Sequence, residues 1–263
     1  MIYALLALTA LLLPAYAVWL AWSAGKGGRF AFALKLSAAV AIMAFLHLVA
    51  RWDWLSIYLP WLWWLLLAAV GIRSLTRVRD HDWAVEPRRK LWFAAVDPLI
   101  GLGLLAYAAI GLFHPPAVDL ELPLRDGSYV VGQGGNSPAL NYHNTHPTQR
   151  YALDIAALDA LGRRAEGLLP TELGAYHIDG VPVVSPCDGT VVAVVDGLPD
   201  NAIGETNAEA AAGNHVVIAC HGVEILLAHL RNGSVAVAPG ATVATGDQLG
   251  LAGNSGNSSE PHL

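Results

Sequence analysis

The residues best suited to chemistry are the histidines of the C-terminal half. Seven of the ten histidines lie between positions 143 and 262. Four of these seven, His143, His146, His229 and His262, stand in short strings that, with one further string, also carry carboxylate, amide and hydroxyl side chains. Imidazole and carboxylate groups gathered in one domain suit metal binding or proton transfer near neutral pH. The strings are NYHNTH (141–146), QRYALD (149–154), AHL (228–230) and GNSGNSSEPHL (253–263).

Two further strings carry Gly, Pro and Asp in the pattern of turns between short strands. They are PVVSPCDGTVV (182–192) and VATGDQLG (243–250). Together with the histidine strings, they make residues 120–263 resemble the lysostaphin-like zinc endopeptidases. Enzymes of that family cut peptide bridges of the bacterial cell wall. The resemblance therefore implies hydrolysis of peptide bonds, with peptidoglycan or a peptide as substrate and Zn²⁺ as cofactor.

The resemblance also implies roles for three residues. Asp154 corresponds to a zinc ligand, and His229 and His262 correspond to the two histidines that flank the metal-bound water. A catalytic zinc keeps an open position, where bound water reaches a pKa of about 7. A neutral imidazole can accept a proton from that water, and an imidazolium can stabilise the oxyanion. We therefore expect a zinc metalloendopeptidase with His229 and His262 as catalytic residues.

The sequence departs from the family pattern in two places. The usual first ligand lies four residues before the aspartate, but Arg150 stands there, and arginine does not give up its proton. His143 or His146 must then supply the metal ligand; we favour His143, which directly follows residues 139–142, and both stay open. The sequence also stops at Leu263, one residue before the expected second His of a His-x-His pair. We expect either a piece of a longer gene product, truncated within this domain, or a degenerate domain that no longer cuts.

Two other functions are kept as alternatives. Family members with broken metal sites act as cell-wall-binding or amidase-activating modules, which a missing ligand would fit. The strings SPCDGTV (185–191) and HGVEILLAH (221–229) also resemble the glucose-type carrier domain of the sugar phosphotransferase system. There His229 would carry phosphate. The carrier is the less favoured alternative, because it requires a cytoplasmic domain.

Short β-rich runs separated by turn residues must position these side chains. We predict strands near 181–184, 190–195, 215–219, 223–229, 235–237 and 248–251, and a partly alternating segment at 120–131. Such spacing is typical of an all-β domain, an antiparallel sandwich or barrel-sandwich over residues 117–263. Residues 156–168 are predicted to form one short helix. Cys187 and Cys220 form either a disulfide or two buried thiols.

The N-terminal 114 residues are of a different kind. All nine tryptophans lie between Trp19 and Trp92, and four apolar stretches, 1–22, 30–50, 57–72 and 91–113, approach the about 20 residues that cross a bilayer. The predicted architecture is thus a transmembrane α-helical bundle of four spans joined to the β domain. Lys35, His47 and Asp97 lie near predicted helix ends, which favours an interfacial role over a transport path.

Charge predicts the orientation of the chain. Residues 73–90 carry six basic side chains, and Lys26 and Arg29 lie in the first loop, so both loops are predicted to face the cytoplasm. The C-terminal domain then lies on the extracytoplasmic side of the cell membrane. A processing site at 15–17 is disfavoured, because cleavage would place the loop of six basic residues outside. Residues 115–263 carry five Lys/Arg against sixteen Asp/Glu, which argues against nucleic acid as a partner.

Overall fold

In the computed structural model, which describes residues 2–26, 28–78, 88–113 and 118–263, the chain folds as two units. The first unit contains the apolar helices and residues Gly135–Tyr151. The second contains Asp53–Leu55, Pro115–Gly134 and Ala152–Leu263. The predicted domain boundary at 114–117 and the basic loop at 79–87 lie outside the described residues.

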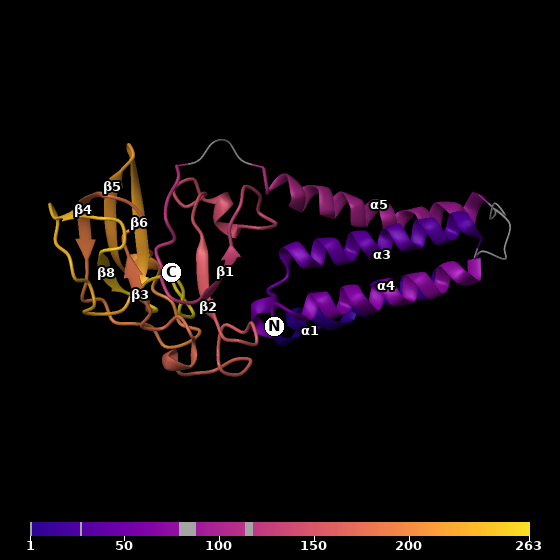
Figure 1. Ribbon diagram of the computed structural model, residues 1–263, viewed down its shortest axis with the longest axis horizontal. Helices are drawn as coiled ribbons and strands as arrows, with labels where there is room; N and C mark the ends of the chain where they lie inside the picture. Colours follow the sequence, from indigo (N-terminus) through magenta and orange to yellow (C-terminus); the bar gives the residue numbers. More distant parts are fainter. Residues whose placement is uncertain (1, 27, 79–87, 114–117) are drawn as a thin grey trace. The chain divides into compact units, whose positions relative to one another are not determined.

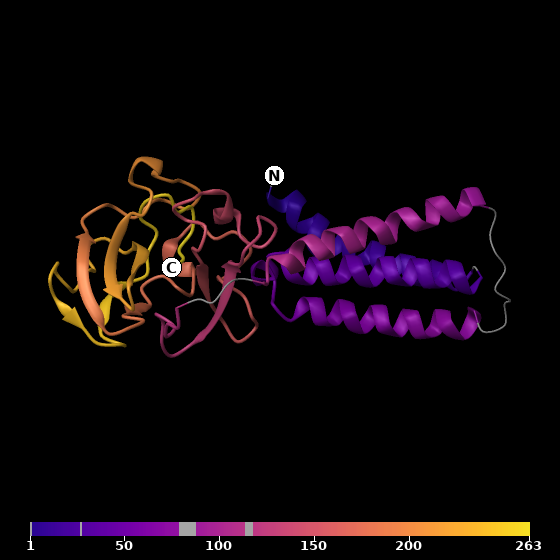
Figure 2. The ribbon, with the colours of Figure 1, turned by 90° about the horizontal axis from the view of Figure 1, so that it is seen from above.

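The first unit is built from long helices (Figures 1 and 2). The π-helical turn η1 interrupts the first of them, and the 3₁₀ turn η2 follows the second. The helix bounds are α1 Ile2–Ala7, η1 Leu8–Leu12, α2 Leu13–Ala24, α3 Arg29–Val49, η2 Trp52–Trp54, α4 Leu59–Val78 and α5 Arg88–Ile110.

Three of these helical segments are long and apolar enough to cross a membrane: Ala4–Ala24, Arg29–Val49 and Leu59–Val78. The sequence predicted four. The fourth predicted span, 91–113, corresponds to α5, whose apolar part Ala95–Ile110 is shorter than the about 20 residues of a full span. The α-helical N-terminal part is therefore confirmed with three candidate spans, and the fourth span is not confirmed.

Small residues allow the helices of this unit to pack closely. Helix α3 packs against α2 and α5, and α2 also packs against α4 (Figure 1). Ala17 and Ala21 of α2 are fully buried in one cluster with Ala38 and Ala39 of α3. Side chains of this size let helix backbones approach, as in membrane helix pairs. Large apolar side chains such as Leu65, which is 68% exposed, point away from the unit.

A hydrogen bond between α4 and η1 fastens the interrupted first helix. Pro14 has no backbone N–H to donate to the carbonyl of Ala10, four residues earlier. The indole Nε1 of Trp63 donates to that carbonyl oxygen at 3.0 Å. Proline thus exposes an acceptor inside an apolar unit, and a side chain of another helix satisfies it.

The second unit is β-rich, and all its strand pairs are antiparallel (Figure 1). A four-stranded sheet has the order β6-β5-β4-β7, and two-stranded sheets pair β1 with β2 and β3 with β8. The strands are β1 Ser128–Gln133, β2 Asp154–Leu158, β3 Pro182–Val184, β4 Gly189–Val195, β5 Asn214–Cys220, β6 Val223–Leu230, β7 Thr242–Val243 and β8 Gln248–Leu251.

The predicted β-rich C-terminal domain is confirmed, with errors in detail. The runs at 181–184, 190–195, 215–219, 223–229 and 248–251 are strands β3, β4, β5, β6 and β8. The helix predicted over 156–168 is wrong, because residues Asp154–Leu158 pair with β1 and become strand β2. The strand predicted at 235–237 is also wrong, since these residues carry no strand assignment. Tertiary pairing overrides the local helical preference of the Ala- and Leu-rich segment.

One buried cluster forms the core of the second unit, and a disulfide closes one end of it. Val183, Val216, Ile218, Leu230 and Leu249 are fully buried in this cluster. Cys187 and Cys220 form a disulfide, which joins the start of β4 to the end of β5. Of the two alternatives left open by the sequence, the structure has the disulfide.

Candidate active site

Asp154 begins β2 and lies beside the last residues of the chain. Gln133 of β1 lies opposite Asp154 on one side of the strand. On the other side, Ile155 and Leu263 exchange two backbone hydrogen bonds, of 2.8 and 3.1 Å. The pairing brings His262 next to Asp154, with His262 Nε2 3.8 Å from Asp154 Oδ1. Both side chains keep partial access to solvent, at 16% and 17% exposed.

Hydrogen bonds at Nδ1 fix the orientation of the His262 imidazole. Nδ1 lies 2.8 Å from the carbonyl oxygen of Glu260 and 3.2 Å from the Ser258 hydroxyl. A carbonyl oxygen can only accept a hydrogen bond, so in the neutral ring Nδ1 carries the hydrogen. Nε2 then presents its lone pair on the side of Asp154, which is the state a metal ligand or a general base requires.

A β-bulge places His229 beside His262. Along β5 and β6, Asn214 pairs with Leu230 and Val216 with Leu227, so two β6 residues face one β5 residue. His229, in this bulge, has a φ of +58°, which is uncommon for a side chain other than glycine. Leu227 and Leu230 both stay in the core, and the bulge turns His229 out of it. Its ring centroid lies 4.7 Å from that of His262.

His229 has the same internal arrangement as His262. Its Nδ1 lies 2.8 Å from the carbonyl oxygen of Ser255, so Nδ1 donates and Nε2 keeps its lone pair. Two neighbouring imidazoles are thus each anchored by a backbone carbonyl of one loop, residues 253–260. Either ring can accept a proton at Nε2 without losing its anchor.

Buried amide and hydroxyl groups fix this loop. Asn254 and Ser255 are fully buried, and Ser258 is 1% exposed. Ser258 Oγ donates to Asn254 Oδ1 at 2.6 Å, and Asn254 Nδ2 donates to the carbonyl of Asn201 at 3.0 Å. Ser255 Oγ donates to the carbonyl of Leu230 at 2.7 Å. Satisfied buried networks of this kind rigidify a loop, here the loop that carries His262.

Two glycines allow the loop to approach its neighbour. Gly256 has a φ of +80°, and a Cβ at this position would meet the backbone of Gly213. Gly213 has a φ of +60°, and a Cβ there would meet the backbone of Ser255. Side chains other than glycine would be strained by the backbone angle and blocked by the neighbouring chain.

His143 and His146, the two alternatives for a further ligand, belong to the first unit. His143 lies in the 3₁₀ turn Tyr142–Thr145, capped by Asn141. Its Nδ1 is 3.2 Å from Gln149 Oε1, and its ring packs on Tyr142 with 4.0 Å between centroids. His146 is exposed. His143 is thus the better fixed of the two.

The donor types at the site fit zinc. Carboxylate oxygen and imidazole nitrogen are common zinc ligands, and Asp154 offers a carboxylate 3.8 Å from Nε2 of His262. Within the described ranges, however, no group of three or more His, Cys, Asp or Glu side chains is arranged to hold a metal ion. Because zinc sites of this class use three protein ligands, a zinc ion bound by Asp154 needs two further donors besides His229 and His262, which the sequence predicts as proton carriers.

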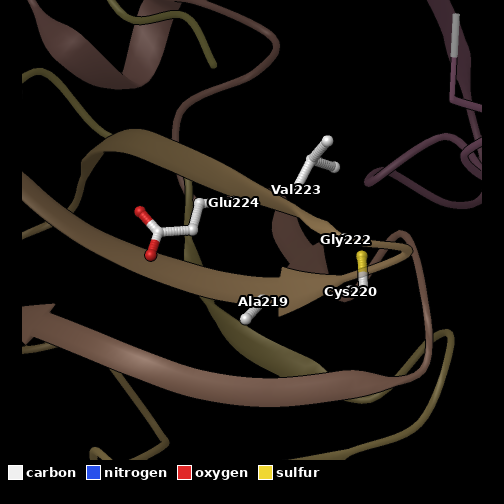
Figure 3. Close-up of a pocket in the computed structure, with 5 residues that line it drawn as sticks. All are labelled: Ala219, Cys220, Gly222, Val223 and Glu224. Atoms are coloured by element: carbon white, nitrogen blue, oxygen red, sulfur yellow. The ribbon is translucent and has the colours of Figure 1, made fainter.

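A cavity of about 370 Å³ opens elsewhere on the second unit and is not part of this site. Ala219, Cys220, Gly222, Val223 and Glu224 line it at the turn between β5 and β6 (Figure 3). It lies at the opposite end of β6 from His229, six residues or about 20 Å along the strand.

Comparison with known families identifies the domain that carries His229 and His262. Residues 175–263 match the family model described as Peptidase family M23. Residues 175–263 are a Peptidase M23 domain. The match supports a peptidase function, as the sequence predicted, and gives no support to the carrier alternative. The M23 domain contains His229 and His262, whereas Asp154 precedes the matched residues.

Two solved structures resemble parts of the chain. A zinc-containing peptidase from Vibrio cholerae is 32% identical, covers 34% of this chain and 23% of its own, and superposes with a TM-score of 0.26. A putative peptidase M23 from Pseudomonas aeruginosa is 18% identical, with coverages of 69% and 56% and a TM-score of 0.32. The chain thus spans about a quarter and about half of their lengths. Both TM-scores are too low to support a conclusion about the fold. A comparison with curated proteins gave no match.

Several residues that shape the M23 site were not assigned a role from the sequence. Asn254, Ser255 and Ser258 stand in the GNSGNSSEPHL string, and their spacing before His262 was the available signal. Asn201 and Gly213 contact this loop from positions about fifty residues earlier in the chain, and no local sequence pattern connects them to the site.

Proposed function

We propose that this protein is a membrane-anchored, zinc-dependent endopeptidase that hydrolyses peptide bonds, with cell-wall peptidoglycan as its substrate. The observation that carries the proposal is the convergence of Asp154, His229 and His262 at the M23 domain. Asp154 would hold the ion together with His143, or with His146 as the alternative. A zinc ion there would supply Lewis acidity, which lowers the pKa of water to about 7 and polarises the scissile carbonyl.

The residues of the chain then handle protons and charge. His229 and His262 each present an Nε2 lone pair, since their Nδ1 atoms are held by the carbonyls of Ser255 and Glu260. One imidazole accepts a proton from the attacking water, and the resulting imidazolium returns it to the leaving amine. The second ring, 4.7 Å away, acts as the imidazolium: with a proton on Nε2 as well, it stabilises the negative charge that develops on the carbonyl oxygen.

We further propose that the second unit lies on the extracytoplasmic side of the membrane. Lys26 follows α2 and Arg29 begins α3, while Arg73 and Arg77 lie near the end of α4, and the positive-inside tendency assigns these helix ends to the cytoplasmic side. The Cys187–Cys220 disulfide supports the same assignment, because disulfides persist in oxidising compartments. Fusions of a periplasmically active reporter after residue 263 test it: activity is expected, and a silent reporter with an active cytosolic one contradicts it.

The test of the enzymatic proposal is digestion of purified peptidoglycan by the full chain in detergent. A second version of the chain carries one added histidine after Leu263. Leu263 pairs with Ile155, so the next residue of this antiparallel register lies opposite Asp154. We expect release of new amino termini, lost in His229→Ala and His262→Ala and retained in His221→Asn. His221 is an exposed turn residue with a φ of +51°, a conformation that asparagine tolerates.

The alternative function is a cell-wall-binding or amidase-activating module without hydrolysis. The observation in its favour is that the described residues contain no group of three metal donors. Peptidoglycan that sediments with the protein, while neither version of the chain releases amino termini, supports this alternative and contradicts the enzymatic one.

A further inference from the structure

A buried arginine lies close to the candidate active site and has no part in the chemistry above. Arg164 is 3% exposed. Its Nη2 lies 2.9 Å from Glu260 Oε2, and its Nε lies 3.7 Å from Asp53 Oδ2. The guanidinium stacks on the Trp54 ring at 3.7 Å, and the Tyr176 ring lies 5.2 Å away. Two carboxylates and two aromatic rings thus enclose one charge.

Burying the guanidinium of Arg164 costs free energy of solvation, which its partners must offset. A buried charge is tolerated only when opposite charges compensate it, and removal of one partner leaves the other uncompensated. Arginine suits this place better than lysine, because its planar group pairs with carboxylates and stacks on aromatic rings at once. Burial and the Glu260 charge raise the pKa of Tyr176, while Arg164 opposes that rise.

Two of the four partners come from the segment between helices α3 and α4. Asp53 and Trp54 belong to the second unit, although the helices on either side of them belong to the first. The backbone is joined as well: the N–H of Arg164 donates to the carbonyl of Asp53 at 2.9 Å. On its other side, Arg164 accepts from the N–H of His177 at 3.1 Å. Asp53 is itself 3% exposed.

The other carboxylate leads to the catalytic loop. Glu260 lies two residues before His262, and its carbonyl oxygen holds His262 Nδ1 at 2.8 Å. The side chain of Glu260 is therefore bound to Arg164 while its backbone orients the imidazole. A displacement of Glu260 moves the carbonyl that sets the direction of His262 Nε2.

We propose that Arg164 is a positioning residue that couples the segment between α3 and α4 to the loop bearing His262. In this account, Asp53 and Trp54 form a structural part of the catalytic unit, although they lie between two helices along the chain. The functional meaning of the coupling rests on the proposed role of His262. The physical coupling itself does not.

The test is hydrogen–deuterium exchange of the full chain in detergent, read by mass spectrometry. The reporter is the segment 257–263, whose amides include Asn257, bonded to Ala211, and Leu263, bonded to Ile155. We expect Arg164→Met and Trp54→Leu to accelerate exchange there about tenfold or more, while the β4–β5 pair stays protected. Arg164→Lys keeps the charge but loses the stacking, and an intermediate acceleration is expected.

The matched control is Arg163→Met. Arg163 is the adjacent arginine and has its own carboxylate, Asp159 Oδ2 at 2.7 Å, but it is 38% exposed and pairs only locally. We expect no change in the 257–263 segment. If Arg164→Met destabilises the whole unit, the milder variants replace it in the test. Asp53→Asn removes one negative charge of the cluster, and Arg164→Lys removes only the stacking on the aromatic rings.

The outcomes separate the proposals. Unchanged exchange in 257–263 for the Trp54 and Arg164 variants overturns the coupling, and so does an increase equal throughout the second unit in Asp53→Asn and Arg164→Lys. The measurement uses no substrate or metal, so a failure of the endopeptidase proposal leaves this result standing. Accelerated exchange together with full hydrolytic activity shows that the coupling exists but does not position His262, which also overturns the proposal.

Discussion

The two units use polar residues in different ways. In the helical unit, polar side chains pair separately across helices: Lys35 Nζ lies 3.2 Å from Ser23 Oγ, and Tyr16 donates to Asp97 at 3.0 Å. The His47 ring meets the Trp61 ring edge-on. In the β-rich unit, by contrast, buried Asn and Ser side chains converge on one loop and hold two imidazoles side by side.

The difference shows that polar side chains gathered at one place indicate a functional site better than the number of polar side chains in a unit does. Lys35, His47 and Asp97 are ionisable residues in apolar helices, where such groups are functional candidates by default. Their separate partners instead fasten helices together. Asp154, His229 and His262 instead lie close together, with the Nδ1 atoms of both imidazoles held by backbone carbonyls, so chemistry is expected in this unit.

Replacement of Gly256 by valine should have the largest effect on the β-rich unit. The position combines a φ of +80° with contact between its Cβ site and the Gly213 backbone. We expect a loss of more than about 4 kcal/mol in the free energy of unfolding, measured with urea, because backbone strain and the blocked approach act together. The control is Gly240→Ala, where φ is +84° but the space is open. Equal losses for both would contradict the argument from close approach.

Removal of the disulfide should come next. Cys187 and Cys220 are 33 residues apart, and loop-closure entropy assigns about 4 kcal/mol to such a link. We therefore expect the paired replacement by serine to destabilise the second unit by up to this amount, while the helicity of the first unit is retained in circular dichroism. A stability unaffected by reducing agent would contradict the presence of the disulfide.

Trp63→Phe tests the helical unit alone. It removes the indole donor to Ala10 and leaves that carbonyl without the bond of 3.0 Å. We expect a loss of about 1 kcal/mol in helix association, read from the thermal midpoint in detergent. Trp61→Phe is the control, because Trp61 is 58% exposed and phenylalanine keeps an aromatic ring beside His47. Hydrolysis by the second unit should not change in either variant. Loss of hydrolytic activity in both would contradict the claim that the polar contacts of the helical unit are separate from the active site.

The smallest effect concerns acid stability. Backbone and hydroxyl hydrogen bonds from Thr245 lower the pKa of Asp188, which joins two turns. A lowered pKa means that the carboxylate stabilises the fold above its ordinary value of 3.8, and that this contribution is lost as the pH falls through the lowered pKa. Asp188→Asn should therefore lower the thermal midpoint at pH 7 but not at pH 2. Asp119→Asn, at an exposed position, should change neither.

Local sequence patterns predicted most helices and strands of this fold, but not which strands pair or which distant side chains meet. Apolar length predicted the helices, and alternating or β-branched runs predicted β3 to β6 and β8. The segment 154–158 was misassigned because its strand state depends on pairing with β1, which no local pattern contains. Asp154, His229 and His262 were proposed from strings that resemble a family. Arg164 could not be found in this way, since its partners Asp53 and Glu260 lie about a hundred residues away on either side.

The most direct test of the account is the zinc content of the purified full chain, with and without an added histidine after Leu263, measured by plasma mass spectrometry. The account predicts about one zinc ion per chain in the extended version, and at least about a tenfold lower content in its Asp154→Ala variant. Asp119→Ala should leave the content unchanged. Stoichiometric zinc that survives Asp154→Ala, or no zinc in either version, would contradict the claim that Asp154 and its neighbouring histidines form a metal centre.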